Sequence, residues 1–100
     1  MPSLTIISWR DIPAQVIVKR GRETAKVQLS ARFQEAVDRA AMRAGKGSSD
    51  AYLADWKRSE ARPCGEDIQA EAAAEAARIE ARFDDAALET LIRAKGLAGP

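Results

Sequence analysis

The sequence contains no histidine and only one cysteine among its 100 residues. Without histidine, the chain lacks the commonest general base, proton shuttle and metal ligand of proteins. A single cysteine cannot form an intrachain disulfide, so a reducing cytoplasm is the expected compartment. Because these absences exclude most arrangements that activate a nucleophile or hold a metal, we expect a protein that is not an enzyme and that binds no cofactor.

Aromatic residues are also scarce, and long apolar runs are absent. Only five aromatic side chains are available to anchor a core, and much of the 46% apolar share is alanine, which buries little area per residue. A small core of this kind often gains stability from a partner, so we expect a protein partner or a homo-oligomer. No run of about twenty apolar residues is present, so no membrane span is predicted.

The net charge is close to zero, but the two halves of the chain differ in sign. Residues 1–50 carry nine Lys and Arg against five Asp and Glu, whereas residues 51–100 carry seven against ten. This mild asymmetry could orient a partner. It falls short of the basic stripe that is typical of a dedicated nucleic-acid binder.

The N-terminal third predicts a small, mainly antiparallel, three-stranded sheet. Residues 4–9 are rich in β-branched side chains, residues 15–20 resume a strand, and residues 23–29 alternate between apolar and polar side chains. Ile12 and Pro13 should interrupt the chain as a turn or a sheet edge, because proline removes a ladder donor. Gly21 suits a hairpin turn between the second and third strands.

Helices are predicted for the rest of the chain, giving an α+β fold. Ser30 should cap a helix that ends near Ala44, and a second helix is expected over residues 50–59. The break at Arg62-Pro63-Cys64-Gly65 suggests a division into an α+β domain, residues 1–62, and an alanine-rich helical extension, residues 63–100. Its long helix, about residues 66–82, carries a narrow apolar line, and a short helix follows Asp84-Asp85. That line could face a partner helix or this protein's own sheet.

The connection between the first two strands is one candidate interaction site. Trp9, Arg10 and Asp11 stand together there, and function often lies on such loops. Arg10 could bind a carboxylate or a phosphate beside the apolar surface of Trp9. In the alternative interpretation, Trp9 belongs to the core while Arg10 and Asp11 form ion pairs at the end of the strand.

Basic residues near the hairpin form the second candidate interaction site. Lys19, Arg20, Arg22 and Lys26 could contact an acidic partner or nucleic acid. No aromatic side chain is interleaved with them, as a stacking surface for bases would require. The alternative is a solvated edge, since charged residues protect sheet edges from aggregation.

Two further features carry weaker signals. Cys64 precedes a helix start, a position that can lower the pKa of a thiol, but neither a histidine base nor a second thiol accompanies it. Asp84 and Asp85 lack the alternating ligand spacing of a calcium loop and are better interpreted as a helix cap.

The sequence resembles the small bacterial proteins grouped as the virulence factor family, and the resemblance lies in residues 6–19, 25–29, 32–45 and 50–56. Its most specific part is the run Trp9-Arg10-Asp11-Ile12-Pro13-Ala14-Gln15. The resemblance covers about residues 4–60 and implies that the alanine-rich tail is a more variable extension. It transfers no catalytic residue. It also implies an accessory role beside one-carbon enzymes such as methylenetetrahydrofolate reductase and corrinoid methyltransferase components.

The residues and the resemblance together lead to one expectation and one alternative. We expect a small non-catalytic accessory protein that docks on a larger enzyme through its hairpin or its alanine-rich helix, with the Trp9–Pro13 connection at or near the contact. The alternative is a nucleic-acid-binding module that uses the basic hairpin, with binding that weakens steeply as salt is added.

Overall fold

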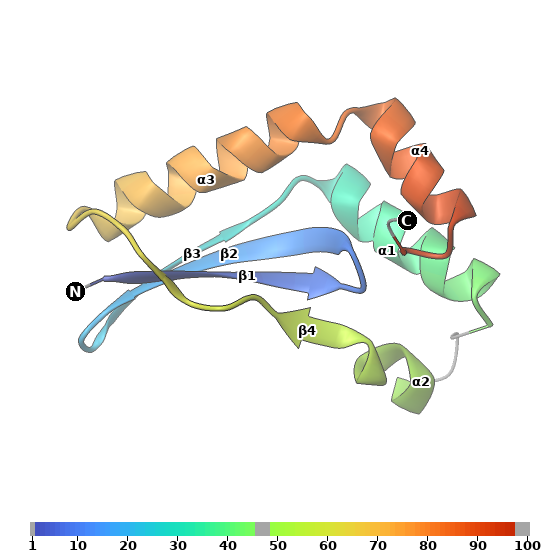
Figure 1. Ribbon diagram of the computed structural model, residues 1–100, viewed down its shortest axis with the longest axis horizontal. Helices are drawn as coiled ribbons and strands as arrows, with labels where there is room; N and C mark the ends of the chain where they lie inside the picture. Colours follow the sequence, from blue (N-terminus) through green and yellow to red (C-terminus); the bar gives the residue numbers. More distant parts are fainter. Residues whose placement is uncertain (1, 46–48, 98–100) are drawn as a thin grey trace.

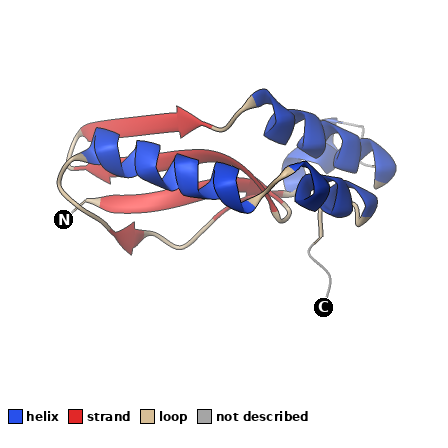
Figure 2. Cartoon of the chain, turned by 90° about the horizontal axis from the view of Figure 1, so that it is seen from above, coloured by secondary structure: helices blue, strands red, loops and turns tan. Residues whose placement is uncertain are grey.

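A five-stranded antiparallel sheet and four helices make up the described part of the chain, so the predicted α+β class is confirmed. The computed structural model describes residues 2–45 and 49–97. Figures 1 and 2 show α3 lying across one side of the sheet, with α1 and α4 at the end of the sheet near the β1–β2 turn. The elements are β1 (Ser3–Trp9), β2 (Ile12–Arg20), β3 (Glu23–Gln28), α1 (Ala31–Arg43), α2 (Ser49–Ala54), β4 (Trp56–Arg58), β5 (Arg62–Pro63), α3 (Ile68–Arg82) and α4 (Asp85–Arg93).

The first three strands form a meander whose first turn lies earlier than expected. Arg10 and Asp11 make the turn, and Arg10 adopts a left-handed backbone with φ of 52°. The sequence predicted that Pro13 would interrupt the chain. Instead, Pro13 lies inside β2, opposite Ser8. The register shifts beside this pair, between Ile7 and Ser8, and such an irregularity lets a proline without an N–H remain within a strand.

Two short strands extend the predicted three-stranded sheet. The strand order is β3-β2-β1-β4, and β5 pairs with β1 beyond β4. The helix predicted for residues 50–59 is therefore wrong in its second half, because Trp56–Arg58 pairs with β1 from Trp9 back to Ile7. The spacing of Tyr52 and Trp56 favoured a helix, but pairing with a distant strand overrides such local preferences.

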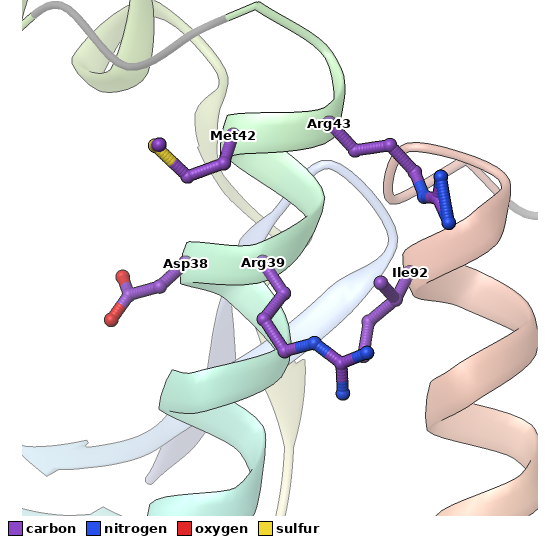
Figure 3. A pocket seen from close by; sticks show the side chains of 5 residues that line it. All are labelled: Asp38, Arg39, Met42, Arg43 and Ile92. Atoms are coloured by element: carbon purple, nitrogen blue, oxygen red, sulfur yellow. The ribbon is translucent and has the colours of Figure 1, made fainter.

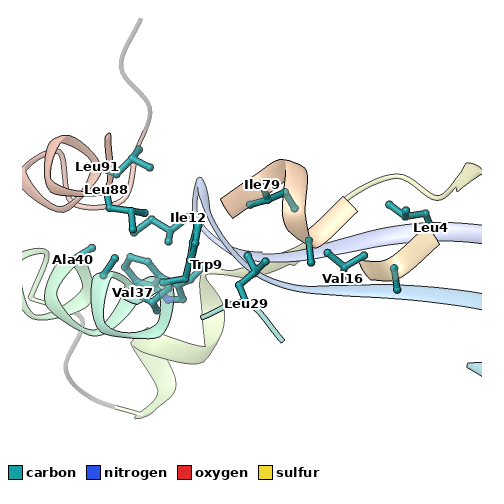
Figure 4. Close-up of a cluster of buried hydrophobic side chains, with 14 of the residues drawn as sticks. Leu4, Trp9, Ile12, Val16, Leu29, Val37, Ala40, Ile79, Leu88 and Leu91 are labelled. Atoms are coloured by element: carbon teal, nitrogen blue, oxygen red, sulfur yellow. The ribbon is translucent and has the colours of Figure 1, made fainter. Parts of the chain in front are cut away.

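The alanine-rich helix α3 packs on β2 and β3 and so covers the protein's own sheet. Its predicted apolar line is confirmed, since Ile68, Ala72, Ala76 and Ile79 are all buried. These residues join Leu4, Val16 and Val18 of the sheet in one core cluster, part of which is drawn in Figure 4. The suggested division at residues 62 and 63 falls within β5, and buried residues from both sides of it belong to this single cluster.

The N-terminus of α1 is tied to α3 by the carboxylate of Glu80. Ser30 is the N-cap, as predicted, but its hydroxyl donates to Glu80 Oε1 (2.9 Å) and makes no cap hydrogen bond to the helix. The backbone N–H of Ser30 donates to Glu80 Oε2 (2.7 Å), and Arg32 pairs with the same carboxylate at 3.0 Å. Burial would raise the pKa of Glu80, but the hydrogen bonds from Ser30 and Arg32 outweigh it and lower that pKa.

This carboxylate cap gives a testable pH dependence. Because the pKa of Glu80 is lower in the folded protein, its stabilisation is complete above the ordinary glutamate pKa and is lost as the pH falls through the folded value. We expect Glu80→Gln to lower the free energy of unfolding by about 1–2 kcal/mol at pH 7 and by much less at pH 3. Urea unfolding at both pH values measures this. Glu35→Gln, at an exposed position on α1, is the control, and an equal cost for Glu80→Gln at both pH values would contradict the assignment.

Candidate interaction surface

Trp9 anchors the turn between β1 and β2 inside the protein. Its side chain is fully buried and packs near Val37 and Ala40 of α1, as Figure 4 shows. The indole stacks on Tyr52 with ring centroids 6.1 Å apart, and its Nε1–H donates to the carbonyl of Tyr52 at 2.8 Å. The core interpretation of Trp9 is therefore the one that the structure supports.

The neighbouring Arg10 and Asp11 connect this turn to two distant segments. Arg10 donates from its backbone N–H to the carbonyl of Asp55 (3.0 Å), from Nε to Asp55 Oδ2 (3.3 Å) and from Nη1 to the carbonyl of Lys95 (2.9 Å). Asp11 donates its backbone N–H to the carbonyl of Gly96 (2.8 Å). These contacts join the first turn of the sheet to the residues that follow α2 and α4.

The two candidate sites lie at opposite ends of the sheet. Figure 1 shows the β1–β2 turn near α1 and α4, and the β2–β3 hairpin at the far end of β2. The nine residues of β2 separate the two ends, a span of about 26 Å at the usual rise per strand residue. One compact site therefore cannot include both sets of residues.

Within the hairpin set, only some of the cations are available to a partner. Arg20 is occupied, because it pairs with Glu23 Oε1 (2.8 Å) and donates to the carbonyl of Glu66 (2.8 Å). The hydrogen bond and charge of Glu23 raise the pKa of Arg20. Lys19, Arg22 and Lys26 are exposed and form no ion pair with another residue of the described ranges.

Lys19 and Lys26 belong to a surface that we call the basic face, the side of the sheet opposite α3. The strand register places its members in three rows, because residues opposite each other in an antiparallel pair share a face. The basic face consists of Ser3, Thr5, Ile7, Gln15, Ile17, Lys19, Thr24, Lys26, Gln28, Arg58 and Pro63.

The alternation of β3 predicted that Thr24, Lys26 and Gln28 would share an exposed face, and all three are exposed. Sequence reasoning missed Arg58, which joins the face only because β4 pairs with β1. The register also places two apolar residues, Ile7 and Ile17, on this otherwise polar side of the sheet. Their position opposite Gln15 and Lys26 is the signal that a correct register would have revealed.

A shallow hollow adjoins the basic face at the edge strand β4. It has a volume of about 210 Å³ and is lined by Ile7, Trp56, Lys57 and Arg58. Trp56 is partly buried and packs edge-on against Tyr52, with ring centroids 5.8 Å apart. The hollow therefore combines two apolar side chains with two cations, of which Lys57 pairs with Asp11 at 3.1 Å.

A larger hollow of about 510 Å³ lies between α1 and α4, but its side chains do not converge. It is lined by Asp38, Arg39, Met42, Arg43 and Ile92, drawn in Figure 3. Asp38 and Met42 point away from α4, and Arg39 pairs with Glu89 at 3.3 Å. This arrangement holds two helices together and offers no ordered set of polar groups to a ligand.

The ionisable groups with shifted pKa values are explained by structural contacts. Burial would raise the pKa of Glu75, but Arg78 and Arg62, at 2.6 and 2.7 Å, outweigh it and lower that pKa. Partial burial and the charge of Glu71 raise the pKa of Cys64, which disfavours the reactive thiolate. Asp84 accepts from the N–H of Ala87 (2.8 Å), which confirms the predicted cap of α4.

The described residues hold neither a cluster of metal ligands nor a helix that could cross a membrane. Within residues 2–45 and 49–97, no group of three or more Cys, Asp or Glu side chains is placed to hold a metal ion. None of the helices in these ranges has the length and apolar character needed to cross a membrane.

Comparison with known proteins gives one match. The family model described as "Virulence factor" matches residues 7–92, which include the Trp9–Asp11 turn, the basic face from Ile7 onward and the alanine-rich helix α3. The match therefore extends beyond residues 4–60 to the helices that complete the core. No curated protein and no solved structure matches the chain. Since most of its length fits the family model, the chain belongs to the virulence factor family.

Proposed function

We propose that this protein is a small non-catalytic accessory protein of the cytoplasm that docks on a larger enzyme. The observation that carries this proposal is the basic face, which has three cations and no carboxylate. Lys19, Lys26 and Arg58 are exposed there and form no ion pair with another described residue. Elsewhere in the described chain, most arginines are paired at 4.0 Å or less, as in Arg32 with Glu80.

The distribution of strained and charged residues also supports binding over catalysis. The unusual backbone of Arg10 is explained by hydrogen bonds to Asp55 and Lys95, and its side chain is mostly buried. Strained residues often mark active sites, but here the strain closes a turn and connects it to two other segments. The resemblance of the chain to its family implies that the enzyme partner belongs to methyl-folate one-carbon metabolism.

Affinity capture from native extract tests this proposal. The full chain, tagged and expressed at its natural level, is expected to recover one partner at a constant stoichiometry. Methylenetetrahydrofolate reductase and corrinoid methyltransferase components are the first candidates to look for by mass spectrometry. A strictly monomeric mass in light scattering, together with no stoichiometric partner, would contradict the proposal.

A further inference from the structure

The basic face combines an apolar centre with a ring of polar and positive side chains. Ile17 lies in its middle row between Thr5 and Lys26, and it is only 9% exposed because its neighbours surround it. Ile7 lies in the next row and forms part of the hollow beside β4. The half-buried Ile7 and Trp56 therefore supply the apolar surface that a partner can reach, and the cations form a polar rim, as in protein–protein interfaces.

The cations are spread over three of the strands and none of them is neutralised within the face. Lys19 and Lys26 are diagonal neighbours on β2 and β3, and Arg58 lies across the sheet on β4. Like charges at such spacing repel one another, and a negatively charged partner would turn that repulsion into attraction. The opposite side of the same sheet is covered by α3, whereas the cations of the basic face are exposed and can be reached by a partner.

The hollow indicates how a partner would be anchored. At about 210 Å³ it is smaller than the roughly 300–1,000 Å³ of most small-molecule sites. It suits one apolar side chain, which would contact Ile7 and Trp56 while carboxylates beside it reach Arg58. A buried apolar anchor surrounded by charges that steer association is a common plan for specific docking.

We propose that the basic face binds an acidic surface of a partner protein, in which carboxylates surround an apolar side chain that enters the hollow at Ile7 and Trp56. This inference rests on the proposed function and specifies the partner's chemistry. The carboxylates pair with Lys19, Lys26 and Arg58, and amide donors of Gln15 and Gln28 satisfy further oxygens.

The centre of the face favours a protein over a nucleic acid. Single-stranded nucleic acids bind sheets on which aromatic side chains stack the bases, interleaved with cations. Here the central positions are Ile7 and Ile17, which offer no ring. Trp56 lies at the edge, is partly buried and is engaged with Tyr52.

Reversing the charges of the basic face and measuring binding to the captured partner tests the inference. Lys19→Glu with Lys26→Glu, and separately Arg58→Glu, are expected to weaken binding of the captured partner by about 10- to 100-fold, as measured by calorimetry. The matched control is Arg43→Glu with Arg82→Glu, which changes the net charge by the same amount as the Lys19 and Lys26 pair. Both control arginines are exposed in the last turns of α1 and α3 and do not belong to the basic face.

Carbodiimide cross-linking provides a second readout, because it joins an amine directly to a carboxylate. We expect cross-links from Lys19 and Lys26 to Asp or Glu of the partner, identified by mass spectrometry. Circular dichroism and thermal unfolding of each variant verify that it folds. Cross-links that avoid both lysines would overturn the inference.

The remaining outcomes separate this inference from the proposed function. If a stoichiometric partner binds wild type and the Lys19 and Lys26 variant equally, the inference fails while the accessory role stands. If wild type captures no partner, the proposed function itself fails. If wild type binds a fluorescent single-stranded oligonucleotide and the Lys19 and Lys26 variant does not, the face binds nucleic acid and the inference is overturned. If wild type forms a dimer and the same variant is monomeric, the face binds a second copy of the chain and the inference is also overturned.

Discussion

Trp9→Ala is expected to lower the free energy of unfolding by about 3–5 kcal/mol, because it removes a large, fully buried ring from the centre of the core. The substitution leaves a cavity among Val37, Ala40 and Tyr52 and orphans the carbonyl that accepts the indole N–H. A domain of this size has only about 5–15 kcal/mol to lose. Thermal unfolding should show a midpoint lower by about 4–8 °C for each kcal/mol.

Trp9→Phe is the matched comparison for this prediction. Phenylalanine keeps an aromatic ring beside Tyr52 but has no N–H for the carbonyl that now accepts at 2.8 Å. Its cost should therefore be smaller, about 1–3 kcal/mol. If Trp9→Ala costs less than about 1 kcal/mol, Trp9 is not the buried anchor described here.

Gly96→Ala is expected to destabilise the protein by about 2–5 kcal/mol for two separate reasons. Gly96 has φ of 84°, a left-handed conformation that costs a residue with a Cβ about 1–2 kcal/mol. An added Cβ would also lie 2.9 Å from Cζ3 and 3.2 Å from Cε3 of Trp9, so the ring or the loop must move. Overpacking of this kind typically costs a further 1–3 kcal/mol.

Gly21→Ala separates the two contributions. Gly21 also has a positive φ, 58°, but nothing lies within 4 Å of the position that a Cβ would occupy. It should therefore show the backbone cost alone, about 1–2 kcal/mol. Equal losses for the two substitutions in urea unfolding would contradict the close approach of Gly96 to Trp9.

The sequence predicted those elements whose signals are local. The alternation of Thr24, Lys26 and Gln28 indicated a half-exposed strand, and Gly21 indicated the hairpin turn before it. The apolar line through Ile68 and Ile79 predicted the buried stripe of α3, since helical periodicity persists over four turns. Periodicity shows which residues are buried but not what they contact. The sequence therefore could not tell whether this stripe packs on the protein's own sheet or on a partner.

Elements that depend on distant partners could not be predicted in this way. Trp56–Arg58 is only three residues long and forms a strand because β1 offers a free edge. Pro13 carries a local signal for interruption, but a register shift opposite Ser8 accommodates it within β2. In both cases a tertiary contact overrides the local preference, and no short window of sequence contains that contact.

The candidate interaction residues also divide into those with local contacts, which could be predicted, and those with distant contacts, which could not. Their charge and exposure could be predicted for Lys19, Arg22 and Lys26, because a hairpin is a local structure. The pairing of Arg20 with Glu23 is also local to the hairpin, but its hydrogen bond to the carbonyl of Glu66, 46 residues away, could not be predicted. Nor could the structural role of Arg10, whose acceptors, Asp55 and the carbonyl of Lys95, lie 45 and 85 residues away in the chain.

The position of α3 in the chain determines when the core side of the sheet can be buried during synthesis. The meander of β1, β2 and β3 leaves the ribosome before α3, so Leu4, Val16 and Val18 are made well before the helix that buries them, which begins at Ile68. The first turn is secured later still, when the carbonyl of Gly96 reaches it. Until α3 has emerged, these apolar side chains stay exposed, and exposed apolar surface of this kind makes a folding intermediate prone to aggregation.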